Sequence, residues 1–360
     1  MSRSLAHIEK IEWIQPIKGK DRIVLAGVLG WTVIVKKDEF QVGDYVVFCE
    51  IDSVFPEKPE YEFLRKNKFR IKTMKMSGVL SQGICFPISV LPNGDYGIGE
   101  DVTGIMGITQ YEATMDKETP AKEVTPTKRY PEFLMRWKWF RELVLPKKES
   151  RGFPTFVSKT DETRIQNAPH YLNMDCKWIA TEKVDGQSGT FFLHKIKGKH
   201  FWNKTKYDFG VCSRNYRLWN EFNTSYWSVA KRYDIHDVLL KLIGDSEWVC
   251  IQGECVAPNV QKNKYHVTEP DLYVFNVIYP TGRLGSIEAK EIVEEHGLKF
   301  VPIINESADI KGMSVSEVLD YATGKSALYD TLREGIVFRS LDGKHSFKAV
   351  SPDFLIKNNE

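Results

Sequence analysis

Short runs of alternating apolar and polar residues, separated by glycines and other turn-forming residues, fill the first quarter of the chain. Alternation of this kind predicts β-strands, because successive side chains of a strand point to opposite faces. The pattern predicts strands over residues 9–17, 22–28, 31–35, 45–51, 70–74 and 82–88. So many short strands in so short a segment favour a small β-barrel, for which the OB-fold is the commonest nucleic-acid-binding example. A barrel that only packs against its neighbour is the alternative.

Strand patterns return in the second half of the chain, over residues 177–181, 190–194, 248–254, 272–279, 335–340 and 346–351. Two helices interrupt them. One follows a capping box formed by Ser314 and Glu317 and ends at Gly324, and the other is bracketed by Ser286 and Gly297. The sequence contains neither a β-α-β pattern nor a P-loop, so we predict an antiparallel α+β domain.

A polar segment with two prolines, residues 115–128, separates the two β-rich parts and is typical of a linker. A short helix is predicted over 131–143, because Pro131 suits a first helical position and Pro146 stops the helix. We therefore expect an OB-fold domain over 1–115, a linker and connecting helix over 116–150, and a second domain over 151–360.

The composition is that of a globular protein without a strong overall charge. The 360 residues are 42% hydrophobic, and the net charge is +2. Any affinity for nucleic acid therefore has to come from local patches. Six cysteines lack the spacing of a metal site and predict reduced thiols. Because no signal peptide or membrane-spanning run is recognisable, we expect an intracellular, cytoplasmic protein.

One such patch lies between residues 58 and 75, where basic side chains alternate with Tyr61, Phe63 and Phe69. Basic side chains follow a phosphate backbone and aromatic rings stack on bases, so this stretch is a candidate nucleic-acid surface. A solvated loop and helix with inward aromatics is an equally acceptable interpretation. The candidate contacts are Arg65, Lys66, Lys68, Arg70, Lys72 and Lys75.

The candidate chemistry begins at Lys183, which lies two residues before Asp185-Gly186. A lone Lys-x-Asp-Gly pattern is weak, but further groups follow it on predicted strands. They are Ser213-Arg214-Asn215, Gln252-Gly253-Glu254, Tyr273-Val274-Phe275, Arg333-Glu334-Gly335 and Ser346-Phe347-Lys348. Taken singly, each is more commonly a surface ion pair or a core residue. In this order they resemble the signature set of the covalent nucleotidyltransferases, which are the ATP-dependent ligases and RNA-capping enzymes.

The resemblance implies that Lys183 attacks the α-phosphorus of ATP, expels pyrophosphate and keeps AMP. An amine with an ordinary pKa of about 10.4 is protonated near neutrality, so the pKa must be lowered by partial desolvation and by a nearby cation, either a metal ion or Lys348. We expect Glu334 to hold Mg²⁺ or Mn²⁺, and Arg214 and Lys348 to supply positive charge to the phosphates.

The same resemblance assigns the rest of the nucleotide. Glu254 would hold the ribose hydroxyls and Phe275 would offer a ring to the adenine. In the RNA-ligase branch the glutamate before the lysine meets the adenine edge, which here is Glu182.

Asp342-Gly343 predicts a hairpin turn between the strands of Glu334 and Lys348. A two-residue loop would direct these two side chains to opposite faces. A three-residue loop, 341–343 with Gly343 left-handed, would direct both to one face. We predict the three-residue loop.

Several features point to one branch of the superfamily. Ser188 stands where many DNA ligases and capping enzymes have arginine, and too few residues follow Lys348 for the C-terminal OB domain of those enzymes. The segments 30–33, 39–44, 50–53, 80–83 and 159–167 instead resemble the Deinococcus-type ATP-dependent RNA ligases. Ser346 departs from the Lys-x-Lys of other RNA ligases, and Lys344 is a candidate to compensate.

The resemblance implies an ATP-dependent ligase that passes AMP to a 5′-phosphate and joins it to an RNA 3′-hydroxyl at a nick. We expect the protein to work as a monomer. The 5′-phosphate strand could be RNA or DNA. An RNA-capping guanylyltransferase and a catalytically silent RNA-binding module are the alternatives.

Overall fold

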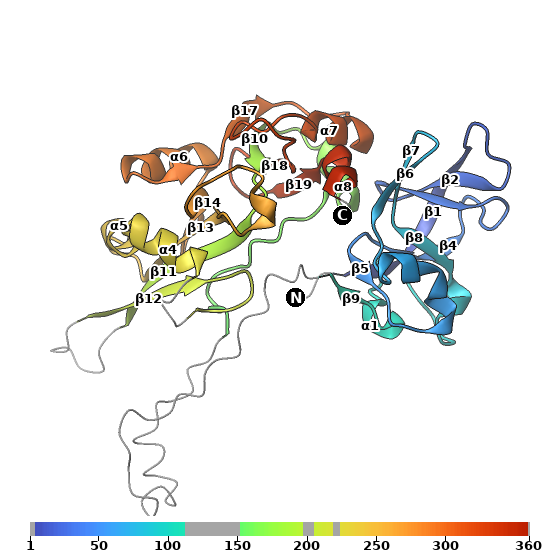
Figure 1. Ribbon diagram of the computed structural model, residues 1–360, viewed down its shortest axis with the longest axis horizontal. Coiled ribbons are helices and arrows are strands. Elements are labelled where there is room, and N and C mark those ends of the chain that lie inside the picture. The colour runs from blue at the N-terminus through green and yellow to red at the C-terminus, as the bar shows by residue number, and fades with distance from the viewer. Residues whose placement is uncertain (1–3, 112–151, 197–204, 219–223, 359–360) are drawn as a thin grey trace, which may run out of the picture.

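The computed structural model describes residues 4–111, 152–196, 205–218 and 224–358. They form an N-terminal β-rich body and a larger body with two sheets, which lie side by side (Figure 1). The predicted linker and the predicted helix over 131–143 lie outside the described residues. None of the helices in the described ranges is long and apolar enough to cross a bilayer.

The N-terminal body is a bent antiparallel sheet with the strand order β3-β2-β1-β4-β8. Its longest strand, β1 (Ala6–Pro16), pairs with β4 along its first half and with β2 along its second, and its register shifts between Ile11 and Trp13. A shift of this kind bends a strand, so the sheet can curl around a core. The other strands are β2 (Ile23–Val28), β3 (Trp31–Lys36), β4 (Tyr45–Cys49) and β8 (Ile84–Pro87). The predicted OB-fold is confirmed.

Smaller elements close the ends of this barrel. A hairpin of β6 (Thr73–Met76) and β7 (Val79–Gln82) follows a 3₁₀ helix over Pro59–Asn67. Strand β6 begins later than the predicted strand over 70–74, and Lys68 and Phe69 take left-handed backbone angles at the end of the 3₁₀ helix. The remaining elements are β5 (Ser53–Val54), α1 (Thr103–Met106) and β9 (Thr109–Gln110).

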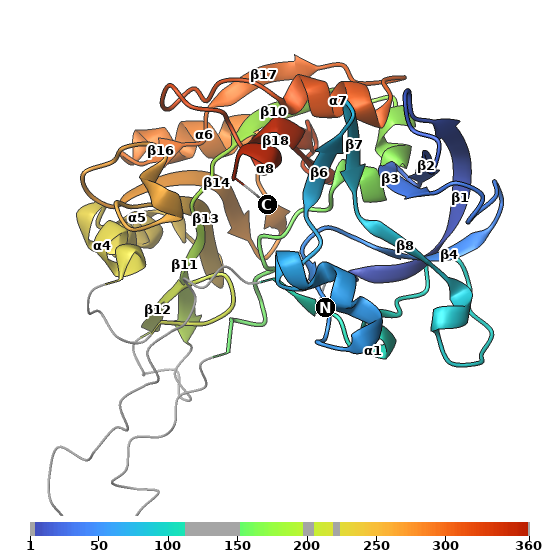
Figure 2. The same cartoon turned by 45° about the vertical axis from the view of Figure 1, so that its right-hand side comes forward.

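The second body contains two antiparallel sheets (Figure 2). The strand order of one is β17-β10-β18-β19, and that of the other is β12-β11-β13-β14-β15. The first consists of β10 (Trp178–Lys183), β17 (Ile303–Ala308), β18 (Gly335–Ser340) and β19 (Ser346–Val350). The second consists of β11 (Gln187–Ile196), β12 (Lys206–Cys212), β13 (Trp248–Val256), β14 (Asp271–Tyr279) and β15 (Gly282–Arg283), and β16 (Lys299–Phe300) pairs in parallel with β14. The predicted antiparallel α+β class is confirmed.

Helices cover these sheets. Helices α4 (Ser225–Arg232), α5 (Ile235–Leu242) and α6 (Ser286–Glu295) pack on the second sheet, and α7 (Val315–Ala322) packs on the first. Helix α7 starts with the predicted capping box, and α6 lies where it was predicted. The sequence did not predict α4, α5 or the C-terminal α8 (Pro352–Asn358). Each spans only about two turns, which is too short for a periodic apolar stripe to stand out.

The C-terminal helix and the segment that enters the second body both dock on the barrel. Phe354 and Leu355 of α8 are buried in the same apolar cluster as the barrel residues. The backbone N–H of Gly30 donates to the carbonyl of Gln166 at 2.9 Å, and a Cβ at Gly30 would lie 2.7 Å from the Gln166 Cα. A larger side chain at position 30 would therefore force the two bodies apart.

A buried charge cluster lies at the same junction. His7 Nδ1 is 2.8 Å from Glu9 Oε1, and its Nε2 is 3.4 Å from Glu50 Oε1. The Asn167 amide of the second body donates to the same Glu50 oxygen at 2.5 Å. Burial alone would lower the pKa of His7, but the hydrogen bonds to Glu50 and Glu9 outweigh it and raise the pKa to about 9. His7 is therefore a cation at neutral pH.

His7→Gln tests this cluster. A pKa raised from 6.5 to about 9 contributes stability that is fully present below pH 6.5 and is lost as the pH rises through 9. The shift corresponds to roughly 3 kcal/mol. We expect the free energy of unfolding in urea to fall between pH 6.5 and 9.5 in the wild type, and to change much less over this interval in His7→Gln. Equal pH dependence of the two proteins would contradict the assignment.

Candidate active site

Lys183 is the last residue of β10, and β10 pairs with β18. Lys183 pairs with Gly335, whereas Glu182 pairs with Ile336, which lies in the apolar core of this sheet. Alternation along the strand therefore turns Lys183 away from that core. Its Nζ lies 2.6 Å from Oε2 of Glu334, and the two side chains are 25% and 15% exposed. The predicted nucleophile thus lies in a partly buried ion pair.

The hairpin between β18 and β19 differs from the prediction. Val337 pairs with Lys348, and the backbone N–H of Ser340 donates to the carbonyl of His345 at 3.0 Å. The loop is therefore four residues long, 341–344, and the predicted three-residue loop is wrong. The Asp342 carboxylate explains the longer turn, because it accepts from the Ser340 hydroxyl at 2.6 Å and from the Lys344 backbone N–H at 3.2 Å.

This register still brings the site residues together. Lys348 lies opposite Val337, and Val337 pairs with Thr181, so Lys348 shares the sheet face of Lys183. Glu334 precedes the first residue of β18, so the alternation of the strand does not fix its direction. Its carboxylate contacts Lys183 and forms the ion pair described above.

A glycine brings the second sheet to the same place. The chain passes from β10 to β11 through Asp185 and Gly186, and a Cβ at Gly186 would lie 2.5 Å from the Cys255 carbonyl oxygen. Only glycine allows this close approach of two backbones. Strand β11 then pairs with β13, and Ser188 lies opposite Glu254. The glutamate predicted for the ribose is thereby placed within electrostatic reach of Lys183.

Two residues that no sequence motif indicated hold Asp185. Lys264 forms an ion pair with the Asp185 carboxylate, and the Tyr265 hydroxyl accepts a hydrogen bond from the Asp185 backbone N–H at 2.8 Å. Both come from the loop between β13 and β14. Their approach to Asp185 follows from the pairing of distant strands, so local sequence carried no signal for it.

The carboxylates around Lys183 govern its charge. Burial alone would lower the pKa of Lys183, but Glu334, Glu254 and Asp185 outweigh burial and raise it. Burial, with Glu334 nearby, raises the pKa of Glu254 to about 8 and that of Asp185 to about 7. The expected lowering of the Lys183 pKa by Lys348 is not found. The described residues around this lysine therefore favour its ammonium form.

The two cations predicted for the phosphates share one anion. Asp161 Oδ2 lies 3.0 Å from Arg214 Nη2, and Asp161 Oδ1 lies 2.8 Å from Lys348 Nζ. Arg214 is 44% exposed and Lys348 is 12% exposed. The fold therefore brings Arg214 and Lys348 together, with the Asp161 carboxylate between them.

The neighbouring Glu162 binds a second set of polar groups. It accepts from the Ser346 hydroxyl at 2.6 Å and contacts the buried Arg339 at 3.3 Å. Burial lowers the pKa of Arg339 to about 10. Arg339 is a cation near the site that the motifs did not indicate. Lys344, the proposed substitute for the missing lysine at Ser346, instead lies 3.5 Å from Asp342 in the turn and is 76% exposed.

Glu182 and Phe275 are held by two further sets of contacts. Glu182 is buried and accepts from the Ser326 hydroxyl at 2.5 Å and from the Ala327 backbone N–H at 2.7 Å. Burial raises its pKa. Phe275 of β14 is partly buried, and the Arg339 guanidinium lies 5.8 Å from its ring centre. Glu182 thus faces the loop around residue 326, on the opposite side of β10 from Lys183.

The donors at Lys183 suit a hard divalent cation that keeps much of its water. Carboxylate oxygens are what Mg²⁺ prefers, and Mg²⁺ is usually bound through one or two of them together with substrate phosphates. Glu334 is such a carboxylate. Among the described residues no group of three or more histidine, cysteine or acidic side chains converges on one point as a ready metal cage. The residues fit a cation that enters with the nucleotide.

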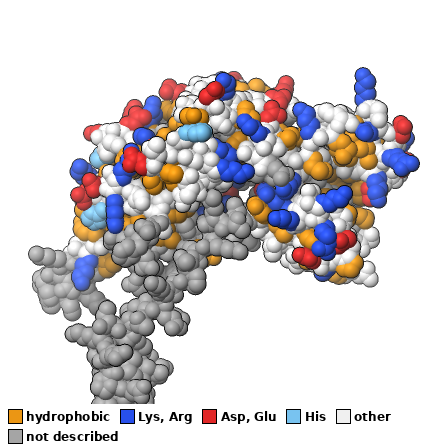
Figure 3. Space-filling view, in the orientation of Figure 1, with side chains coloured by type: hydrophobic (Ala, Val, Ile, Leu, Met, Phe, Trp, Pro, Cys, Tyr) orange, Lys and Arg blue, Asp and Glu red, His pale blue; other side chains and the backbone are white. Residues whose placement is uncertain are grey.

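The basic stretch of the barrel divides into buried and exposed parts. Arg70 is buried, pairs with Asp52 at 2.6 Å and lies 3.6 Å from the Tyr111 ring centre, so it is not presented at the surface. Arg65 pairs with Glu62 at 2.5 Å. Lys66, Lys68 and Lys75 are exposed and Lys72 is partly exposed. In the space-filling view, basic side chains gather along the junction of the two bodies (Figure 3).

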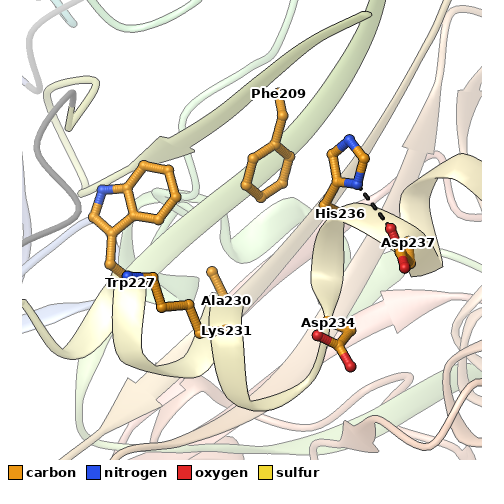
Figure 4. A pocket seen from close by; sticks show the side chains of 7 residues that line it. All are labelled: Phe209, Trp227, Ala230, Lys231, Asp234, His236 and Asp237. Carbon is orange, nitrogen blue, oxygen red and sulfur yellow. Dashed lines mark hydrogen bonds and ion pairs between the residues drawn. The ribbon is translucent and has the colours of Figure 1, made fainter.

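Two cavities lie away from Lys183. One, of about 410 Å³, is at the junction and is lined by residues from both bodies, among them His7, Glu50 and Asp161. The other, of about 260 Å³, lies beside α4 and α5 (Figure 4). There the rings of Phe209 and Trp227 and the side chain of His236 border a shallow hollow.

Comparisons with known proteins agree with this architecture. Residues 5–88 match an OB-fold domain family and residues 176–352 match the RNA ligase family. The search of curated proteins found no match. Among solved structures, a variant of the Naegleria gruberi RNA ligase with ATP and Mn is 31% identical, covers 99% of this chain and 98% of its own, and has a TM-score of 0.79. The same ligase with PPi is 30% identical, with 99% of each chain covered and a TM-score of 0.78.

Matches of this identity extend over both bodies and not only over the second one. The order of the domains, an OB-fold followed by the nucleotidyltransferase sheets, is the order that the sequence motifs indicated. The chain therefore belongs to the family of ATP-dependent RNA ligases.

Proposed function

We propose that Lys183 is the nucleophile of this ligase and carries AMP between ATP and RNA. The ion pair between Lys183 Nζ and Glu334 Oε2, 2.6 Å apart, supports this most directly. It presents one amine, partly exposed, at the point where the two sheets of the second body meet. The solved structures of the Naegleria gruberi RNA ligase with ATP, AMP and PPi make the nucleotide chemistry of this chain the first hypothesis to test.

Three transfers complete the reaction. The Lys183 amine attacks the α-phosphorus of ATP, a P–N bond forms, and the bond to the β-phosphate oxygen breaks as pyrophosphate leaves. An oxygen of the RNA 5′-phosphate next attacks the AMP phosphorus and releases the lysine. The RNA 3′-hydroxyl then attacks the activated 5′-phosphate, a phosphodiester forms, and AMP departs.

The cations paired with Asp161 would serve the first transfer. A triphosphate carries more negative charge than one carboxylate, so it can replace Asp161 as the partner of Arg214 and Lys348. Charge spread over the transferring phosphoryl group would then be balanced by these two side chains. Glu254 would accept hydrogen bonds from the ribose hydroxyls, and Phe275 would contact the adenine. Glu182 would meet the adenine edge only after it leaves Ser326 and Ala327.

The charge of Lys183 sets a requirement for a divalent cation. We propose Glu334 as its ligand, with Mg²⁺ or Mn²⁺ as the ion. Such an ion stabilises charge on the phosphates and makes the ammonium form of a nearby lysine less favourable. Glu334 would exchange its partner, and Lys183 would lose a proton and become nucleophilic.

We infer that the substrate is a nicked duplex whose 3′-hydroxyl strand is RNA. The barrel lies beside the catalytic body, and its exposed Lys66, Lys68 and Lys75 could follow a phosphate backbone. The domain division proposed from the sequence, with boundaries near residues 115 and 150, and a monomeric state fit this arrangement. All six cysteines are free thiols, which supports an intracellular site of action.

Lys183→Ala is expected to abolish both adenylation and sealing, because it removes the amine that is paired with Glu334 and proposed to attack ATP. The measurement is retention of label from ATP in the presence of Mg²⁺, followed by sealing of RNA ends. Lys348→Ala is the comparison, because it keeps the nucleophile and should mainly weaken the reaction with ATP. Enzyme-bound AMP at the wild-type level in Lys183→Ala, or label from GTP and not from ATP, would overturn the proposal.

The proposed substrate predicts that the sealing rate depends on whether the 3′-hydroxyl strand carries ribose or deoxyribose. Duplexes with RNA on the 3′-hydroxyl side should be sealed whether the 5′-phosphate strand is RNA or DNA. Replacing the 3′-hydroxyl strand by DNA should slow sealing roughly tenfold or more, because hydrogen bonds to the 2′-hydroxyl are lost. Single-turnover sealing rates on the four strand combinations measure this. Equal rates on all four would contradict it.

The barrel surface predicts a salt dependence. Lys66→Ala with Lys68→Ala should weaken binding to a nicked duplex and lower the slope of log affinity against log salt by about 1 per lysine that contacts phosphate. Lys18→Ala with Lys20→Ala, two exposed lysines elsewhere on the barrel, is the matched control. If both pairs change affinity and slope equally, the basic stretch is not a specific contact.

A further inference from the structure

The loop between β13 and β14 has an unusual backbone. Gln261, Lys262 and Asn263 are consecutive non-glycine residues with left-handed φ angles of 45°, 57° and 49°, and His266 follows with 51°. Side chains with a Cβ rarely adopt this region, and several together persist only where surrounding contacts enforce them. The Asn263 amide provides one such contact, because it donates to the Val267 carbonyl and accepts from the Val267 N–H, both at 2.9 Å.

This backbone carries Lys264 and Tyr265 to the catalytic motif. The Lys264 ammonium pairs with the Asp185 carboxylate, and these side chains are only 14% and 8% exposed. Tyr265 accepts from the Asp185 backbone N–H at 2.8 Å. The next residue, His266, stacks on Tyr329 with ring centres 4.6 Å apart. The loop therefore clamps Asp185, two residues after the nucleophile, through both its side chain and its backbone.

The same lysine also touches the helix that docks on the barrel. Its Nζ lies 4.1 Å from the ring centre of Phe354, which is 1% exposed and belongs to the barrel's apolar cluster. An ammonium over an aromatic face is attracted to it, and the attraction is stronger when both groups are shielded from water. Lys264 is therefore held from two sides, by Asp185 in the catalytic body and by Phe354 at the junction with the RNA-binding domain.

We propose that Lys264 is a positioning residue for adenylation: it holds the Asp185 carboxylate on itself and keeps it from pairing with Lys183. The inference rests on the proposed role of Lys183. Three carboxylates act on the nucleophile, from Glu334, Glu254 and Asp185. Lys264 gives Asp185 a cation of its own. Without it, the Asp185 carboxylate would be available to pair with Lys183, on which its charge already acts, and would compete with the α-phosphorus for the amine.

A purely structural role would have other consequences. A lysine that only stabilises its loop would lower the melting temperature when removed, and every step would lose activity in proportion to unfolded protein. A positioning role affects the step in which the Lys183 amine attacks, and leaves nucleotide binding unchanged, because Lys264 contacts Asp185 and Phe354 and lies outside the set proposed for ATP. The two roles are distinguished by comparing the rate of adenylation with the affinity for ATP.

The test measures single-turnover transfer of label from ATP to the full-length enzyme in Mg²⁺. Lys264→Met is expected to lower the adenylation rate roughly ten- to a hundredfold at saturating ATP, as displaced reacting groups do, with little change in the ATP concentration for half-maximal rate. Lys264→Arg keeps a cation over the ring and should restore most of the rate. Lys262→Met, an exposed lysine in the same loop, is the matched control and should behave as the wild type.

A double-mutant cycle addresses Asp185 directly. If Lys264 acts by holding Asp185, Lys264→Met should have little further effect on the residual rate of Asp185→Asn. Phe354→Leu, which keeps the apolar volume and removes the ring, should lower the rate less than Lys264→Met does.

The outcomes separate this inference from the proposed function. If the wild type takes up label and Lys183→Ala does not, yet Lys264→Met reacts at the wild-type rate, the role of Lys264 is wrong and the nucleophile stands. The role is also wrong if Lys264→Met loses rate only in proportion to lost folded protein, or if its effect simply adds to that of Asp185→Asn. If the wild type takes up no label from ATP, the proposed function itself fails.

Discussion

A lysine amine enclosed by carboxylates is the constraint on which the arrangement of the second body depends. Lys183 lies at the end of one strand, Glu334 just before the start of its neighbour, and Glu254 on a strand of the other sheet. Their charges hold the amine protonated, and burial leaves Glu254 and Asp185 with raised pKa values. Like charges that share a partly buried site cannot all stay ionised without cations. The chain supplies two such cations, because Lys183 pairs with Glu334 and Lys264 pairs with Asp185.

Acidic and basic side chains are also paired around Arg214 and Lys348. Asp161 sits between Arg214 and Lys348, and Glu162 sits beside Arg339. Two cations brought together without an anion would repel each other, so a carboxylate between them stabilises the folded protein. Both acids lie a few residues before Gln166, whose carbonyl accepts a hydrogen bond from Gly30 of the barrel. Contacts to Arg214 and Lys348 and contacts to the barrel thus come from one short stretch of chain.

The junction of the two bodies is made by the chain on both sides of the catalytic domain. Gln166 and Asn167 dock from its beginning and α8 docks from its end. Through Phe354 and Lys264 the second of these contacts reaches Asp185. A change in the packing of the barrel against α8 would therefore reach Asp185 through the contact of Phe354 with Lys264.

Much of this could be predicted from local pattern. Alternating runs marked most of the strands, Ser314 and Glu317 marked the start of α7, and the ordered motifs marked Lys183, Glu254 and Glu334. These features are encoded by near neighbours along the chain: side-chain periodicity, a cap, and spacing within a motif. The helices α4, α5 and α8 were not predicted, because two helical turns give too little apolar periodicity to recognise.

Contacts between distant segments could not be predicted from local sequence. The four-residue turn depends on side-chain hydrogen bonds of Asp342 and Ser340, which residue type alone did not reveal. Three interactions join residues that lie tens of positions or more apart in the sequence. They are the ion pairs of Lys183 with Glu334, of Lys348 with Asp161 and of Lys264 with Asp185. The order of residues specifies which chemical groups the protein carries and how they follow one another along the chain. Folding decided which charges meet, because burial and proximity, and not spacing along the chain, set the strength of every electrostatic interaction in the site.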